Sequence, residues 1–157
     1  AKMQQALAMF RNAGMRQEII KRDGYTVIAD CYNAGPESME AALQVLADTP
    51  TQGRRIAVLG DMLELGVCSP AEHYRIGRLA AQTANALFTY GKMAGRYISG
   101  AVTGGMNQKR VTTYKTHEEL ADALKRFAKP GDVLLFKGSR GMRMEQALEM
   151  FFQQEKK

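Results

Sequence analysis

The chain has 157 residues, 45% of them hydrophobic and 24% charged, which suits one soluble domain with a proper core and excludes two large ones. The net charge of +6 comes from scattered Lys and Arg residues without interleaved aromatics, which disfavours a nucleic acid partner and fits a surface suited to small anions. No apolar run approaches the roughly 20 residues that cross a bilayer, and two cysteines exclude a disulfide framework, so we expect no membrane partner and a cytoplasmic setting.

The first thirty residues predict a helix and a hairpin. Apolar residues at helical spacing predict a helix over residues 2–12 that ends near Gly14. Residues 17–22 and 25–30 then flank an Asp-Gly dipeptide, which is typical of a tight hairpin turn. Because the chain begins directly in the helical pattern, we interpret it as a piece of a longer protein.

From residue 25 onward, predicted strands and helices alternate. Such alternation predicts an α/β fold, a three-layer Rossmann-like, doubly wound and mostly parallel sheet with the helix and hairpin as an N-terminal appendage. The predicted strands are 25–30, 55–60, 86–90, 110–114 and 133–137. One predicted helix begins at Pro36, and the others span residues 70–85, 93–102, 117–129 and 142–154.

The strands differ in how apolar they are, and this difference predicts their places in the sheet. Residues 56–59 and 133–136 are continuously apolar, as strands buried on both faces tend to be, so we expect them in the centre. Residues 111–114 are more polar, which suits an edge strand.

Helix starts and loops give further predictions. Ser69 and Thr116 each begin a capping-box pattern and should cap the helices that follow. Residues 100–109 form the segment that we expect to be a mobile loop. His73 and His117 both lie in first helical turns, where we expect surface or capping roles and no catalytic one.

Polar residues follow four of the predicted strands. Asp30, Asp61, the turn 90–92 and the segment 137–140 all fall at carboxyl ends, which meet at one edge of a parallel sheet. We therefore predict a ligand site there, whereas the alternative is that these are ordinary polar turns.

Individual residues at this edge allow more than one role. Asp30 can accept hydrogen bonds from a ribose diol or cap the following helix, and Asn33 can meet a base edge or bond its own backbone. Lys137, Ser139 and Arg140 suit a phosphate or a carboxylate, and Arg140 is the stronger candidate because its planar fork binds a carboxylate with two hydrogen bonds.

The segment 60–66 has acids at Asp61 and Glu64 between two glycines, which predicts a shaped ligand loop; alternatively, Leu63 and Leu65 fold into the core. Neither a Gly-x-x-x-x-Gly-Lys-Ser/Thr motif nor a Gly-x-Gly-x-x-Gly motif after a strand occurs, so this chain does not hold a triphosphate as a P-loop does.

Three motifs together resemble a known family. They are Asp-x-Tyr-Asn-Ala-x-Pro-x-Ser-Met at 30–39, Gly-Asp-Met-x-Glu-Leu-Gly at 60–66 and Lys-Gly-Ser-Arg-x-Met-x-Met-Glu at 137–145. Their order and spacing resemble the C-terminal domain of the Mur ligases, most closely the MurF branch. Sister Mur ligases and folylpolyglutamate synthetase share the fold and a related first turn. Cys31 and Gly35 depart from the commoner residues at their positions.

The resemblance implies an ATP-dependent ligase that adds D-alanyl-D-alanine to UDP-N-acetylmuramoyl-tripeptide through an acyl phosphate. Residues 1–13 would end the central domain, residues 14–26 would connect the domains, and residues 27–157 would form the C-terminal domain. The partners would be the protein's own N-terminal and central domains, in a monomer. The P-loop and the ligands of the Mg²⁺ that accompanies ATP would lie in the central domain, so the fragment should be inactive alone.

The resemblance also implies roles for residues, with no catalytic residue and no metal ligand in this chain. Nucleotide contacts would come from three residues of the first motif: Asp30, Tyr32 and Asn33. Substrate contacts would come from the other two motifs: Asp61, Glu64, Lys137, Ser139 and Arg140.

Two other classes of function compete with this one. Asp30, Asp61 and Lys137 at three strand ends loosely imitate a phosphoacceptor receiver domain, although a receiver normally has paired acids after its first strand. A bare interaction module is the third interpretation.

Overall fold

A computed structural model describes residues 17–153, so the helix predicted over residues 2–12 lies outside the described residues. Strands β1 (Glu18–Arg22) and β2 (Tyr25–Asp30) form the predicted antiparallel hairpin. Its turn residues Asp23 (φ 54°) and Gly24 (φ 86°) both have positive φ angles, as the favoured two-residue hairpin turn requires.

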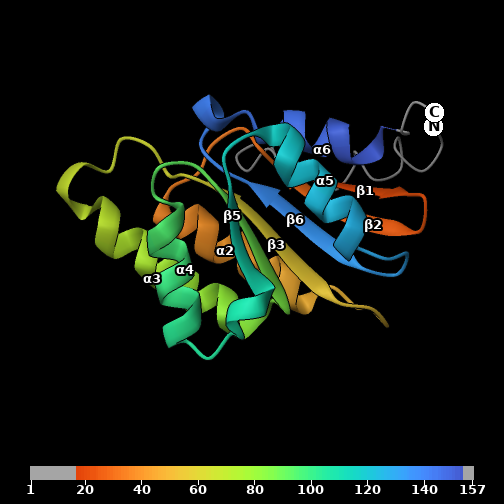
Figure 1. Cartoon of the computed structure of the whole chain (residues 1–157), viewed down its shortest axis with the longest axis horizontal. Coiled ribbons are helices and arrows are strands. Elements are labelled where there is room, and N and C mark those ends of the chain that lie inside the picture. Colours follow the sequence, from red (N-terminus) through yellow and green to blue (C-terminus); the bar gives the residue numbers. More distant parts are fainter. Residues whose placement is uncertain (1–16, 154–157) are drawn as a thin grey trace.

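The described strands form one six-stranded sheet in the order β1-β2-β6-β3-β4-β5, and every pairing beyond the hairpin is parallel (Figure 1). The mostly parallel, doubly wound sheet is therefore confirmed, with two apolar strands in the centre and the polar one at an edge as predicted. The remaining strands are β3 (Arg55–Gly60), β4 (Ala86–Tyr90), β5 (Val111–Tyr114) and β6 (Val133–Lys137).

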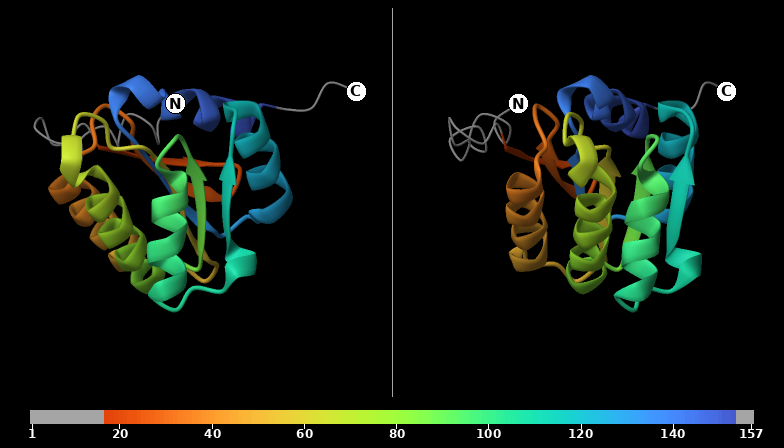
Figure 2. Two further views of the ribbon diagram at one scale, coloured as in Figure 1. Left: turned by 60° about the vertical axis from the view of Figure 1, so that its left-hand side comes forward. Right: turned by 90° about the vertical axis from the view of Figure 1, so that its left-hand side faces the viewer.

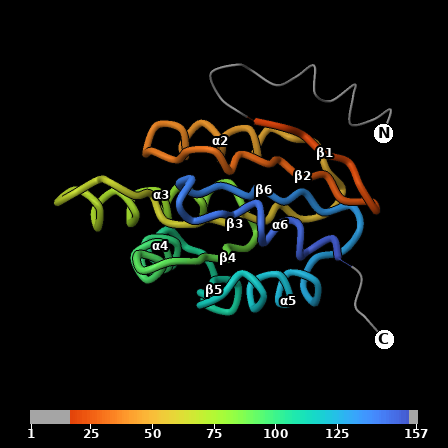
Figure 3. Tube along the Cα trace, turned by 90° about the horizontal axis from the view of Figure 1, so that it is seen from above, coloured from red at the N-terminus to blue at the C-terminus, as the bar shows by residue number. Residues whose placement is uncertain are grey.

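Helices cover both faces of the sheet, which gives the predicted three layers. In the right-hand view of Figure 2, α2, α3 and α4 lie side by side on one face, while Figure 3 shows α5 and α6 on the other side of the sheet. The helices are α2 (Pro36–Asp48), α3 (Ser69–Thr83), α4 (Ala94–Thr103), α5 (His117–Phe127) and α6 (Met144–Phe152).

Alternate residues of the central strands supply two cores. In β3, Ala57 and Leu59 pack with α2, α3 and α4, whereas Ile56 and Val58 pack with α5 and α6. All four are fully buried, because successive side chains of a strand point to opposite faces and both faces are covered.

Two glycines let α3 and α4 approach closely. A Cβ on Gly77 would overlap the backbone carbonyl of Tyr97, and a Cβ on Gly100 would overlap that of Tyr74. The prediction of a mobile loop over residues 100–109 is therefore wrong for its first part. Helix α4 continues to Thr103, and Gly100 is buried in the contact between α3 and α4.

One predicted helix cap is present and the other is wrong. The Thr116 hydroxyl accepts a hydrogen bond from the Glu119 N–H (3.0 Å) and caps α5. Ser69 lies inside α3, which follows directly on the 3₁₀ turn Gly66–Cys68, so its side chain does not cap the helix.

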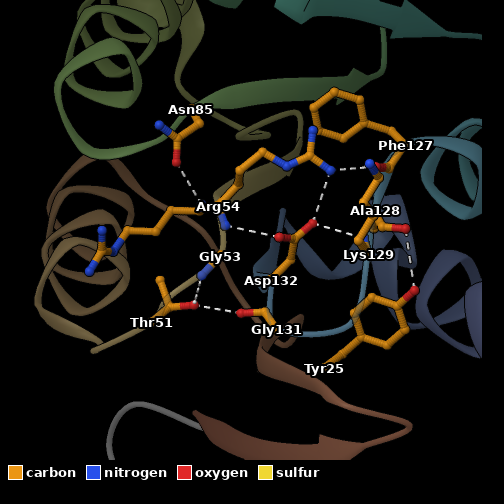
Figure 4. Close-up of polar contacts among 11 residues, drawn as sticks. Tyr25, Thr51, Gly53, Arg54, Asn85, Phe127, Ala128, Lys129, Gly131 and Asp132 are labelled. Atoms are coloured by element: carbon orange, nitrogen blue, oxygen red, sulfur yellow. Dashed lines mark hydrogen bonds and ion pairs between the residues drawn. The ribbon is translucent and has the colours of Figure 1, made fainter.

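The amino ends of the strands are joined through Asp132 (Figure 4). This buried carboxylate accepts hydrogen bonds from the N–H of Arg54 (2.9 Å), the N–H of Lys129 (2.9 Å) and the Arg54 guanidinium (3.2 Å). The same guanidinium lies 4.0 Å from the centre of the Phe127 ring. The loops before β3 and β6 are thus fixed together at the end opposite the predicted site.

Candidate functional site

The structure brings the predicted turns to one edge of the sheet. In the strand register, Asp30 at the end of β2 pairs with Lys137 at the end of β6, which in turn pairs with Leu59 of β3. Gly60 of β3 pairs with Tyr90 at the end of β4. The segments after these four strands are therefore neighbours.

Asp30 and Lys137 form a buried ion pair. Lys137 Nζ lies 2.8 Å from Asp30 Oδ2 and also donates to the Asn33 carbonyl (2.8 Å), while 1% of Lys137 and 3% of Asp30 is exposed. Burial raises the pKa of the Asp30 carboxyl, and the ammonium group of Lys137 opposes this shift. The Lys137 ammonium group therefore faces the interior of the first turn.

The first turn is held by its own side chains. The Asn33 Oδ1 accepts from the Ala34 N–H (2.8 Å), which is the local backbone role that the sequence left open. Ser38 caps α2, since its hydroxyl accepts from the Gly35 N–H (3.0 Å) and donates to the Gly35 carbonyl (3.2 Å). Asp30 consequently does not cap this helix, because its carboxylate faces Lys137.

Ser139 joins three turns. Its hydroxyl accepts from the Leu63 N–H (2.7 Å) and donates to the Ala34 carbonyl (3.2 Å), and its own N–H donates to the Asp61 carbonyl (2.9 Å). The Ser139 side chain is buried and fixes these loops to one another. The sequence did not reveal this role, because burial cannot be read from the motif alone.

Asp61 fixes a fourth turn. Its carboxylate accepts hydrogen bonds from the Met93 N–H at 3.1 and 3.2 Å, just before α4 begins. A Cβ on Gly91 would overlap this carboxylate, so the turn can pass so close only with glycine there. Burial raises the pKa of the Asp61 carboxyl, and the hydrogen bond from the Met93 N–H opposes the shift.

His73 is not a surface or capping residue, and that prediction is wrong. It is fully buried, its Nε2 accepts from the Met62 N–H (2.9 Å), and its Nδ1 donates to the Ser69 carbonyl (2.7 Å), which fixes the tautomer. Its ring contacts that of Tyr97, whose hydroxyl donates to the Gly60 carbonyl (2.9 Å). The sequence signal for its burial was helical spacing, which places His73 on the same face of α3 as three apolar or small residues: Ile76, Gly77 and Ala80.

Four of the predicted residues are exposed: Tyr32, Asn33, Glu64 and Arg140. Tyr32 is 44% exposed, and the Arg140 guanidinium lies 5.3 Å from the centre of its ring. Glu64 is exposed with a φ of 65°, a left-handed conformation that is uncommon outside glycine. Leu63 is 42% exposed, whereas Leu65 packs against the core, so the core alternative holds for Leu65.

A groove of about 690 Å³ lies at the carboxyl ends of β3, β4 and β5. Lys92 and Lys115 bring positive charge to it, and the side chains of Tyr90 and Tyr114 are part of its wall. Lys115 and Tyr114 were missed in the sequence, although their position at the end of β5 was a usable signal. The full lining is Asp61, Leu63, Tyr90, Gly91, Lys92, Ala94, Gly95, Thr113, Tyr114, Lys115 and Met142.

Within residues 17–153, no helix is long and apolar enough to cross a membrane. The same residues contain no group of three or more His, Cys, Asp or Glu side chains that could hold a metal ion.

Comparison with known proteins gives a consistent result. The sequence model for the glutamate ligase domain of Mur ligases matches residues 15–140. The UDP-N-acetylmuramoyl-tripeptide–D-alanyl-D-alanine ligase of Bacillus subtilis (strain 168) is 39% identical over 145 residues, covering 91% of this chain and 32% of that protein. The ligase of the same name from Mycobacterium tuberculosis (strain H37Rv) is 39% identical over 143 residues, covering 79% of this chain and 28% of that protein.

Solved structures agree with the sequence relatives. The MurF ligase of Thermotoga maritima in complex with ADP superposes with a TM-score of 0.74 at 29% identity, over 87% of this chain and 30% of that one. A MurF structure from Acinetobacter baumannii gives 0.74 at 30% identity, over 89% of this chain and 30% of that one. The chain thus spans about a third of the length of the relatives it matches.

Proposed function

Since this chain belongs to the Mur ligase family through a glutamate ligase domain like that of MurF, we propose that the whole protein adds D-alanyl-D-alanine to UDP-N-acetylmuramoyl-tripeptide. ATP would convert the tripeptide carboxylate to an acyl phosphate, and the dipeptide amine would displace phosphate to form the amide. The activity for which the B. subtilis relative is named supports this specificity over other Mur-type ligases and over a folylpolyglutamate synthetase-like enzyme.

The observation that carries the proposal is the cationic groove at the strand ends. Two of the three family motifs border it, through Asp61, Leu63 and Met142. Lys92 and Lys115 give it the charge that a peptide carboxylate needs, while Leu63 and Met142 give it apolar wall for the methyl groups of two alanines.

The groove suits an amine nucleophile as well as a carboxylate. An amine attacks only in its neutral form, and positive charge from Lys92 and Lys115 favours that form by lowering the amine pKa. We assign the exposed residues Arg140 and Glu64 to the same substrate. Asp61 would act by fixing the turn that presents Lys92.

The nucleotide would lie against the first turn. Tyr32 and Asn33 are exposed there, and Asp30 would contribute by holding the turn through Lys137. Ser139 would position the same turn through the Ala34 carbonyl. The ADP of the T. maritima structure supports a nucleotide in the full-length protein. We place the P-loop and the Mg²⁺ ligands in the central domain, since the P-loop motif does not occur in this sequence.

The phosphoacceptor alternative finds less support. A receiver needs an accessible carboxylate, and both candidates are almost fully buried: Asp30 pairs with Lys137, and Asp61 accepts hydrogen bonds from the Met93 N–H.

Phosphate release by the full-length protein tests the proposal. With ATP, Mg²⁺ and UDP-N-acetylmuramoyl-tripeptide, release should require D-alanyl-D-alanine and should not be supported by single amino acids. Release with glutamate or diaminopimelate in place of the dipeptide would assign the protein to another branch, and no release at all would refute a ligase.

Variants of the groove test its assignment. Lys92→Gln and Lys115→Gln should each raise the KM for D-alanyl-D-alanine about tenfold with little effect on the KM for ATP, since each removes one cation from the carboxylate. Lys129→Gln, at the opposite end of the sheet, is the matched control. Equal changes in both KM values would contradict the assignment.

A further inference from the structure

A second hollow lies at the outer edge of the sheet, between β5 and α5. It measures about 280 Å³. The left-hand view of Figure 2 shows this edge, with β5 beside α5. The lining combines aromatic and cationic side chains: Phe88, Lys109, Arg110, Thr112, Tyr114, Ala123, Arg126 and Phe127.

The floor of this hollow is aromatic and ordered. The rings of Phe88 and Tyr114 stack with their centres 5.9 Å apart and an angle of 11° between their planes. The ring of Phe127 lies 5.4 Å from that of Phe88, and Phe127 is itself held by the Arg54 guanidinium. Phe88 is buried, whereas Tyr114 and Phe127 are half-buried, so a flat apolar group can rest here on the accessible parts of these two rings.

The walls carry three cations from two elements. Lys109 and Arg110 come from the 3₁₀ turn before β5, and Arg126 comes from the last turn of α5. None of the three forms an ion pair with another residue of the described range 17–153, and Asp122, one turn before Arg126, does not pair with it. An alternative role for these cations is to keep the edge strand β5 from pairing with other chains. That role would not explain the aromatic side chains in the same hollow.

We propose that this hollow is a binding site for a small aromatic anion, an aryl phosphate or aryl carboxylate. The ring of the ligand lies on Tyr114 and Phe127, and its anionic group meets Arg110 and Arg126. Guanidinium groups suit both anions because they donate two parallel hydrogen bonds. The site is separate from the groove at the strand ends, and the two share one wall residue, Tyr114.

Titration of the ¹⁵N-labelled chain with phenyl phosphate, followed by amide chemical shifts, tests the proposal. Saturable shifts should appear at Thr112, Ala123 and Phe127, with smaller ones at Gly91 and Gly95 of the other groove. Inorganic phosphate should bind at least about tenfold more weakly, since it lacks the ring.

The double variant Arg110→Gln/Arg126→Gln should weaken binding of phenyl phosphate at least tenfold. Arg78→Gln/Arg96→Gln removes the same charge from exposed positions of α3 and α4 and should leave binding unchanged. All four side chains are exposed, so folding should survive, and Lys109→Gln alone gives a second, milder test. Equal binding of inorganic phosphate, equal loss in both double variants, or shifts centred on Gly91 would each overturn the proposal.

Discussion

Gly77 of α3 lies against the backbone carbonyl of Tyr97 in α4, with no room between them for a side chain. The same Tyr97 donates its hydroxyl hydrogen to the Gly60 carbonyl, where the second family motif begins. The close contact between α3 and α4 thus fixes Tyr97, and through it the end of β3 beside the groove.

Gly77→Ala should therefore destabilise the fold by about 3 kcal/mol, because the added methyl group forces α3 and α4 apart. Gly95→Ala is the control within α4, since nothing lies within 4 Å of the added Cβ, and it should stabilise the helix by about 0.5–1 kcal/mol. Urea unfolding of both variants measures the difference. A cost below about 1 kcal/mol for Gly77→Ala would show that the helix contact is looser than it looks.

The Asp30–Lys137 pair predicts a non-additive double mutant. Asp30→Asn should cost about 3–5 kcal/mol, because it leaves a buried ammonium group without its counter-ion. Lys137→Met in the same chain should recover part of that loss, since it removes the uncompensated charge. Denaturant unfolding of the two single variants and the double variant gives the coupling energy. Additive costs would mean that the two charges do not depend on each other.

Removing the carboxylate at the opposite end of the sheet should also be costly. Asp132→Ala leaves the N–H groups of Arg54 and Lys129 without their acceptor, at an expected cost of about 2–4 kcal/mol. Asp122→Ala, on the exposed face of α5, should stay within about 0.5 kcal/mol of the parent chain. Thermal unfolding compares the two. Similar melting temperatures for the two variants would show that the hydrogen bonds of Asp132 do not stabilise the fold.

The two cysteines should differ in reactivity with pH. Burial raises the pKa of the Cys31 thiol to about 12, helped by the carboxylates of Glu145 and Asp30. Because the thiolate is the reactive form, about one Cys31 in ten thousand is reactive at pH 8, and its alkylation rate should rise about tenfold per pH unit up to pH 11. Cys68 is exposed and should be labelled first.

Mass spectrometry after timed iodoacetamide treatment of a Cys68→Ser variant isolates the Cys31 rate. A rate that levels off near pH 9 would show that this thiol is not held in a buried, anionic setting.

Tyr32 predicts a nucleotide effect in the full-length enzyme. Tyr32→Ala should raise the KM for ATP about tenfold and leave the KM for the dipeptide unchanged, whereas Tyr32→Phe should retain the ring and the parent KM. Steady-state kinetics with each substrate varied in turn separates the two. If the dipeptide KM rises instead, the first turn belongs to the other substrate.

Much of the fold could be predicted because the signals are local. Continuous apolar runs placed β3 and β6 in the centre, and the polar run of β5 placed it at the edge. The cap at Thr116 depends only on the three residues that follow it. Ser69 carries a similar pattern but lies within α3, because the preceding 3₁₀ turn already starts the helical path.

The contacts at the site could be predicted only in part. The sequence indicates which residues end strands, but not that β6 lies between β2 and β3, which is what places Lys137 against Asp30. It also cannot distinguish a serine that faces a ligand from Ser139, which is buried between two turns. Lys115 needed the pairing of β5 with β4 before it could be placed at the groove.

The central position of β6 also bears on how the chain folds. This strand joins β2, more than a hundred residues earlier in the sequence, to β3, and without it the sheet falls into a hairpin and a three-stranded remainder. Among the strands of residues 17–153, the central strand β6 is therefore the last to be synthesised, and β2 and β3 lack their shared neighbour until then. Such long-range pairing slows folding, so the chain should acquire its stable structure only after Val133–Lys137 has emerged.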